Sequence, residues 1–249
     1  MHNLLRNLKS EYLKAKHTPL GPAHIFIPCA MAAVFLCYYA VTPWDSYTKV
    51  QAYFQMMGLG YPFLIGTFCA IVAEQEAYAG AFQVILSARD RKATFLSKVL
   101  FLFLTGAFSV MLASVLFGTG YCFVLRQRVV AWSFYWIAGL IMAGGSFFLY
   151  LWHMFLALRF NRGVTIGLGI AGSLLAAVLL TGLGDGIWFL IPAAWASRMV
   201  CSLMPAYSAE GIPVTDCGKA AWICTAATVA ALMVYRIWSD CWDGRKGNE

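Results

Sequence analysis

Charged residues are scarce in this sequence. Asp, Glu, Lys and Arg make up only 12% of the 249 residues, whereas 61% are hydrophobic. In soluble globular domains roughly a quarter of all residues are charged, because charged residues are needed to cover the surface. The apolar residues here are also gathered into several runs near or above the length that crosses a bilayer as a helix. The composition therefore excludes a soluble domain and predicts an all-α integral membrane protein.

Motifs of nucleotide-binding and metal-dependent enzymes are also missing. The sequence has no GxxxxGK[ST] loop for ATP and no HExxH pair for zinc. Histidine occurs four times, and only His153 falls inside an apolar run. A histidine at membrane depth is a candidate functional residue, although a hydrogen-bonded packing role is the more frequent one. We expect no catalytic residue, no metal and no cofactor bound by this chain.

Glu74 and Glu76 raise one catalytic alternative, because paired carboxylates can activate water in an intramembrane protease. Glutamate-type membrane proteases carry an EExxxR run, whereas this sequence reads EQEAYA, with no arginine at that spacing. A structural role is therefore favoured for both acids.

The longest polar interval between apolar segments is AEQEAYAGAFQVILSARDRKATFLSK, residues 73–98. Apolar residues recur in it every three or four positions, which predicts one amphipathic helix across residues 74–95. Acids at its start and basic residues at its end would both complement the helix dipole. Such a helix is suited to lie at the membrane surface and to contact a soluble partner.

The remaining sequence predicts six spans and two surface regions. Leu4, Leu5, Leu8 and Tyr12 share one face of an amphipathic helix across residues 1–18, which we expect to lie on anionic membrane lipids. Residues 182–218 are rich in Trp, Pro and Gly and predict short interfacial or re-entrant helices; a seventh span at Gly186–Met204 is the alternative. The expected spans are residues 24–41, 52–73, 96–124, 131–160, 164–181 and 219–238.

The net charge of +7 does not indicate a nucleic-acid-binding protein, because the basic residues flank apolar segments instead of forming a patch. Positive charge at such positions sets topology. With both termini in the cytoplasm, only five of the 18 Lys and Arg residues would lie outside. We therefore expect a multi-pass membrane protein with both termini in the cytoplasm.

This layout resembles the permease subunits of type-2 ABC exporters. The shared features are six spans, an amphipathic N-terminal helix, an acidic-then-basic coupling helix between spans two and three, and short helices before the last span. The coupling interval is similar to that of MutG-type lantibiotic-immunity permeases, as are the stretches WHMFLALRFNRGVTIGLGIAGSLLAA and LLTGLGDGIWFLIPAAW.

The resemblance implies a partner-driven export mechanism. Two copies of a cytoplasmic ABC ATPase would bind and hydrolyse ATP, and a second, homologous permease would complete the complex, which would expel a lantibiotic that has landed on the producer's membrane. The expected ATPase-coupling residues are Glu74, Glu76, Gly80, Gln83, Arg89, Arg91 and Lys92. The candidate substrate contacts are Trp188, Trp195, Tyr207 and His153.

Two alternatives stay open at this stage. The chain could be an ABC permease for another amphiphile, such as a different antimicrobial peptide, a lipid or a drug. It could also be a passive immunity protein that binds the peptide without an ATPase partner.

Overall fold

The computed structural model describes residues 2–16, 18–208, 211 and 217–244. Among these residues, six helical segments are long and apolar enough to span a membrane. This confirms the expected fold class, an all-α membrane protein with six spans. The six segments are α2 (Leu20–Val41), α3 (Ser46–Tyr78), α5 (Arg91–Thr119) continued by η1 (Gly120–Val124), α6 (Trp132–Arg159), α7 (Arg162–Leu179) and α9 (Cys217–Cys241).

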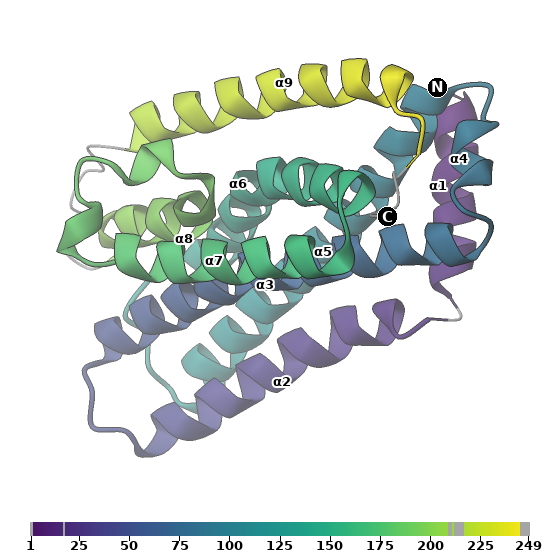
Figure 1. The fold of residues 1–249 in the computed structure, drawn as a ribbon. Coiled ribbons are helices and arrows are strands. Elements are labelled where there is room, and N and C mark those ends of the chain that lie inside the picture. The colour runs from purple at the N-terminus through teal and green to yellow at the C-terminus, as the bar shows by residue number, and fades with distance from the viewer. Residues whose placement is uncertain (1, 17, 209–210, 212–216, 245–249) are drawn as a thin grey trace.

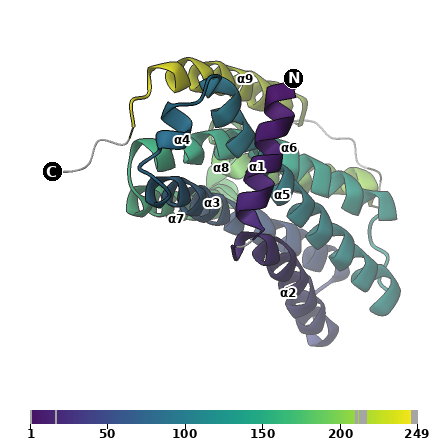
Figure 2. The same ribbon diagram turned by 90° about the vertical axis from the view of Figure 1, so that its right-hand side faces the viewer.

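Shorter elements lie toward the two ends of this bundle. α1 (His2–Ala15) runs across one end, roughly at right angles to α7 and α9, and α4 (Gln83–Leu86) lies beside it (Figure 1). Viewed from that end, α1 crosses in front of α5 (Figure 2). We call this the α1–α4 end. The elements toward the opposite end are η2 (Gly182–Gly184), η3 (Trp188–Leu190), α8 (Pro192–Leu203) and η4 (Met204–Tyr207).

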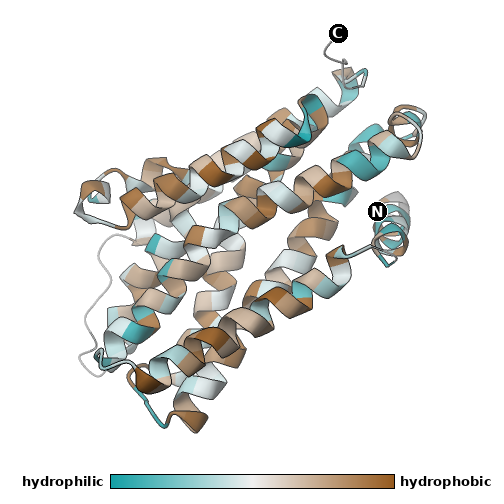
Figure 3. Cartoon of the chain, turned by 60° about the horizontal axis from the view of Figure 1, so that its bottom comes forward, coloured by the Kyte–Doolittle hydropathy of each residue, from teal (hydrophilic) through white to brown (hydrophobic). Residues whose placement is uncertain are grey.

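Hydropathy varies along the length of the long helices. Hydrophobic residues run along the middle of the long helices, and hydrophilic residues gather toward the ends (Figure 3). The pattern is the one expected of helices whose middle portions lie in hydrocarbon.

α3 is longer than the sequence indicated. It continues through Tyr78, five residues beyond the expected end of the span at Ala73. Nothing between Glu74 and Tyr78 breaks a helix, and the first glycine after this stretch is Gly80. With 33 residues, α3 is about 50 Å long, well beyond the roughly 30 Å of hydrocarbon that a span must cross.

α8 is too short to be a seventh span. Its 12 residues extend over about 18 Å, and it packs against α6 and α3. Arg198 on α8 donates from Nε to the Leu179 carbonyl at 2.5 Å and from Nη2 to the Thr181 carbonyl at 2.6 Å. The first bond satisfies a carbonyl that the end of α7 leaves without a helical partner; the Thr181 carbonyl also accepts from the Gly184 amide at 3.0 Å. The membrane side on which α8 lies stays a prediction.

Small residues bring α7 against α3. A Cβ atom on Gly169 would lie only 3.0 Å from the Pro62 carbonyl oxygen. One turn later, the Ser173 hydroxyl accepts a hydrogen bond from the Phe63 amide at 3.2 Å. Gly169 and Ser173 of α7 thus pack within the chain, as small residues do between membrane helices.

Replacing Gly169 by leucine should therefore weaken the bundle. The added side chain meets the α3 backbone, and overpacking of this kind costs about 1–3 kcal/mol. Gly167→Leu is the matched control, because a Cβ on Gly167 meets nothing within 4 Å. Unfolding titrations in mixed micelles should show a lower midpoint for Gly169→Leu alone; equal midpoints for the two variants would contradict the packing.

Candidate functional site at the α1–α4 end

A cluster of three buried charges and one exposed lysine lies at the α1–α4 end. Lys98, on α5, is fully buried, and its Nζ donates to Oε1 of Glu11 at 2.9 Å and to Oε1 of Glu76 at 2.5 Å. Lys14, on α1, donates to the same two oxygens, at 3.1 Å and 2.6 Å. Two cations thus share two carboxylates, so the cluster is neutral and joins α1, α3 and α5.

The cluster compensates the charge of Glu76, which the dipole of α3 opposes. Glu76 lies in the last turn of α3, where the dipole favours cations, and Lys14 and Lys98 neutralise it there. Burial alone would lower the pKa of Lys14, but its hydrogen bond to Glu76 and the charges of Glu11 and Glu76 outweigh burial and raise that pKa. Lys14 therefore stays charged through the physiological pH range, and its share of the stabilisation is lost only as the pH rises through the raised pKa.

The junction between α3 and α5, residues 79–90, begins with a strained backbone. Gly80, Ala81 and Phe82 have φ values of 145°, 47° and 65°. Positive φ is uncommon for residues that carry a Cβ, so Ala81 and Phe82 must be held there by their surroundings. Hydrogen bonds from the Ala81 amide to the Ala77 carbonyl at 2.8 Å and from the Phe82 amide to the Glu76 carbonyl at 3.2 Å close the end of α3.

Buried side chains anchor this junction. Phe82 is 5% exposed and meets Trp242 edge-on, with ring centroids 5.2 Å apart. Ile85 on α4 is fully buried. Arg91 donates to the Leu86 carbonyl at 3.0 Å, and Lys92 pairs with Asp240 at 2.8 Å. The junction is thereby fixed both to α5 and to the C-terminal end of α9.

The opposite side of the junction and the adjoining last residue of α3 present apolar groups outward. Tyr78 is 86% exposed and Val84 is 57% exposed. Both stand at the charged end of the molecule, among the exposed polar residues Gln83 and Arg89. An exposed aromatic and an exposed aliphatic side chain on an anchored support are suited to contact another protein.

A scan against protein-family models matched residues 7–178 to a model described as "ABC-2 family transporter protein". The match takes in most of the chain, from α1 to α7, and so includes both the charge cluster and the junction. The chain belongs to the ABC-2 transporter family. It is therefore a membrane component of an ABC transporter, as the type-2 permease resemblance implied. A search of curated proteins found no match.

In this ABC-2 family member, the expected coupling segment is not one helix. Residues 74–78 complete α3, residues 79–82 turn, α4 has only four residues, and α5 begins at Arg91. Glu74 and Glu76 thus lie at a helix end, and Arg91 and Lys92 at a helix start, the reverse of the expected dipole arrangement. Asp90 compensates at the start of α5, where its carboxylate accepts from the Ala93 amide at 3.0 Å.

Three members of the cluster were missed by sequence reasoning, although the sequence carries a signal for each. Glu11 is the only acid before Asp45, and Lys14 follows it at helical spacing. Lys98 falls two residues inside the expected third span, where a lysine requires a partner. Their meeting with Glu76 depends on α1 folding back across the bundle, which no local pattern indicates.

The four candidate substrate contacts of this permease do not form one exposed site. Trp195 is 1% exposed and donates from Nε1 to the Phe189 carbonyl at 2.8 Å, and Trp188, 6% exposed, packs in the same small core. Tyr207 is half-buried against Phe134. His153 is buried on α6, where its Nδ1 faces Gly66 of α3. Both tryptophans are core residues in this conformation and not surface contacts, because their rings fill the space between α8 and its neighbours.

Removing the buried lysine should cost far more stability than removing an exposed one. Lys98→Met leaves two buried carboxylates with one cation, and breaking a buried pair costs about 3–5 kcal/mol. The control, Lys92→Met, removes a pair whose side chains are about half exposed, which is worth about 0–1 kcal/mol. Unfolding titrations should rank the variants in that order, and a Lys98→Met midpoint equal to that of Lys92→Met would contradict the cluster's role.

Proposed function

We propose that this permease subunit exports a lantibiotic from the membrane of the bacterium that produces it, and thereby protects the producer. ATP would be hydrolysed by two copies of a separate cytoplasmic ATPase, and a second homologous permease would complete the complex. Membership of the ABC-2 family supports the transporter role. The lantibiotic itself rests on the similarity of the coupling interval and of the two later stretches to immunity permeases.

The observation that carries the ATPase contact is the anchored junction with its outward apolar pair. Tyr78 and Val84 are exposed at the charged end of the bundle, where a cytoplasmic partner can approach. The same short segment is held from behind by Phe82, Ile85 and the Arg91 guanidinium. A push on α4 would therefore be transmitted to α3, α5 and α9 instead of being absorbed by a loose loop.

Expulsion then requires that movement at the α1–α4 end reaches the long helices. α3 and α5 emerge directly from the junction and are joined again by Glu76 and Lys98. A displacement of α4 would thus tilt these two helices together with α1. That concerted motion is the proposed link between ATP hydrolysis and release of the peptide on the outer side.

A charge on the outward face of α4 should weaken ATPase capture. Val84→Asp introduces a carboxylate into the proposed contact without touching the buried anchor. Leu183→Asp is the matched control, because Leu183 is 75% exposed and lies in η2, toward the opposite end. Co-purification of the ABC ATPase partner should fall several-fold for Val84→Asp alone. Undiminished capture by Val84→Asp would refute the contact.

Peptide-dependent hydrolysis tests the substrate. The purified permease–ATPase complex, reconstituted in vesicles, should hydrolyse ATP faster when lantibiotic is added, because bound substrate favours the productive conformation. Hydrolysis without a response to the peptide would agree with the permease role but would exclude the lantibiotic as the substrate. Protection of cells that persists when ATP hydrolysis is abolished would favour a passive peptide-binding protein.

A further inference from the structure

A cavity of about 90 Å³ lies between α2, α3, α5 and α6. A buried water needs roughly 10–15 Å³ measured in this way, so the cavity holds more than one water-sized group. Its lining is apolar except for four residues, and water is stable in a cavity only with two to four polar partners. Most of this volume is therefore unsuited to water.

The cavity is elongated along the helices. Met56, Gly60, Leu64 and Phe68 line it from α3 at intervals of four residues, and Ala23, Ile27 and Met31 line it from α2 at the same interval. The α3 positions span about 18 Å along the helix axis. Met56 is 49% exposed, so this side of the slot opens laterally at the surface of the bundle. A narrow apolar slot of this length is too small for a helix, whose diameter is about 10 Å, but matches an alkyl chain.

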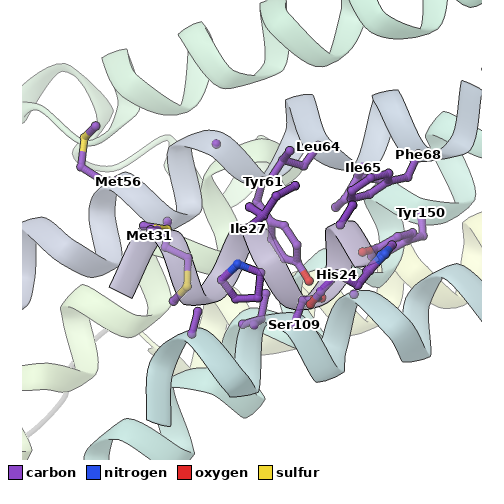
Figure 4. A pocket seen from close by; sticks show the side chains of 17 residues that line it. His24, Ile27, Met31, Met56, Tyr61, Leu64, Ile65, Phe68, Ser109 and Tyr150 are labelled. Atoms are coloured by element: carbon purple, nitrogen blue, oxygen red, sulfur yellow. The ribbon is translucent and has the colours of Figure 1, made fainter. Parts of the chain in front are cut away.

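One polar atom that faces the slot has no partner. The Nδ1 of His24 lies 2.7 Å from the Leu20 carbonyl, which can only accept, so Nδ1 carries the proton and Nε2 of the neutral ring is an acceptor. That Nε2 has no hydrogen-bond partner among the described residues, and His24 is 6% exposed. Tyr61 also lines the slot, and its hydroxyl interacts with Ser146 and Tyr150. Figure 4 shows the side chains of His24 and Tyr61 turned toward the space between α2, α3 and α5.

This polar atom is placed asymmetrically in the slot. His24 lies one turn after the start of α2 and stacks on Phe68, with ring centroids 4.4 Å apart. It therefore marks the α1–α4 end of the slot, while Met31 and Met56 line the other end. A ligand that satisfies this arrangement has a hydrogen-bond donor at one end and a long apolar chain extending from it.

We propose that the slot binds an acyl chain of a membrane phospholipid whose headgroup carries an N–H or O–H donor. The donor bonds to Nε2 of His24. The acyl chain runs along α3 toward Met56 and fills the volume that no side chain occupies. The site depends on neither the ATPase partner nor the exported substrate.

Gly60 offers a way to fill the slot without disturbing the fold. It lines the cavity, and a Cβ added there meets nothing within 4 Å. Leucine is also a better helix former than glycine. Gly144, on α6 and outside the slot, is the matched control, because a Cβ there likewise meets nothing within 4 Å.

Photo-crosslinking tests the site. The permease is placed in vesicles with phosphatidylethanolamine that carries a diazirine midway along one acyl chain, and labelled peptides are mapped by mass spectrometry. Labelling should concentrate on residues 23–31 and 56–68, fall several-fold in Gly60→Leu and persist in Gly144→Leu. Labelling spread evenly over all membrane-facing helices, or unchanged in Gly60→Leu, would overturn the proposal.

The headgroup contact has its own readout. Phosphatidylcholine bearing the same diazirine has no N–H donor, so the wild-type protein should be labelled less by it than by phosphatidylethanolamine. His24→Phe should remove this preference while keeping the slot apolar. Equal labelling by the two lipids in the wild-type protein would refute the His24 contact.

Discussion

The four-charge cluster at the α1–α4 end is the interaction on which the rest of this structure depends. Lysines and glutamates that are removed from water cost several kcal/mol each unless they are paired with good geometry. Here each carboxylate accepts from two lysines and each lysine donates to two carboxylates, so no charge in the group lacks a partner. Because the members come from α1, α3 and α5, satisfying them requires these three helices to meet in one arrangement.

That arrangement explains the shape of the junction. With the end of α3 and the start of α5 joined through Glu76 and Lys98, the chain has only residues 79–90 to connect them. The turn accordingly uses positive φ at Gly80, Ala81 and Phe82, and Phe82 is buried beneath it against Trp242. The residues left on the outside, Tyr78 and Val84, are consequently presented on a rigid support.

The sequence predicted the spans well because each is a long apolar run bounded by charged or turn-forming residues. It predicted the coupling segment poorly. The apolar spacing of Ala77, Phe82 and Ile85 fits a helix, but Ala81 and Phe82, which follow Gly80, adopt a left-handed backbone conformation instead. The coupling role of the acid-then-basic pattern stays a prediction, and the contacts of Glu76 and Lys98 reach residues 62 and 87 positions away along the chain. Such contacts are set by the packing of α1, which is decided by tertiary structure and not by local propensity.

The most direct test of this account is a double-mutant cycle between Glu76 and Lys98. Unfolding free energies would be measured for Glu76→Gln, Lys98→Met and the double variant, which removes one charge of each sign. If the cluster joins α3 to α5, the two effects are coupled by more than about 1 kcal/mol, and the double variant is more stable than the sum of the single losses predicts. Effects that add to within about 0.5 kcal/mol would mean that the two side chains do not depend on each other, and would contradict the account.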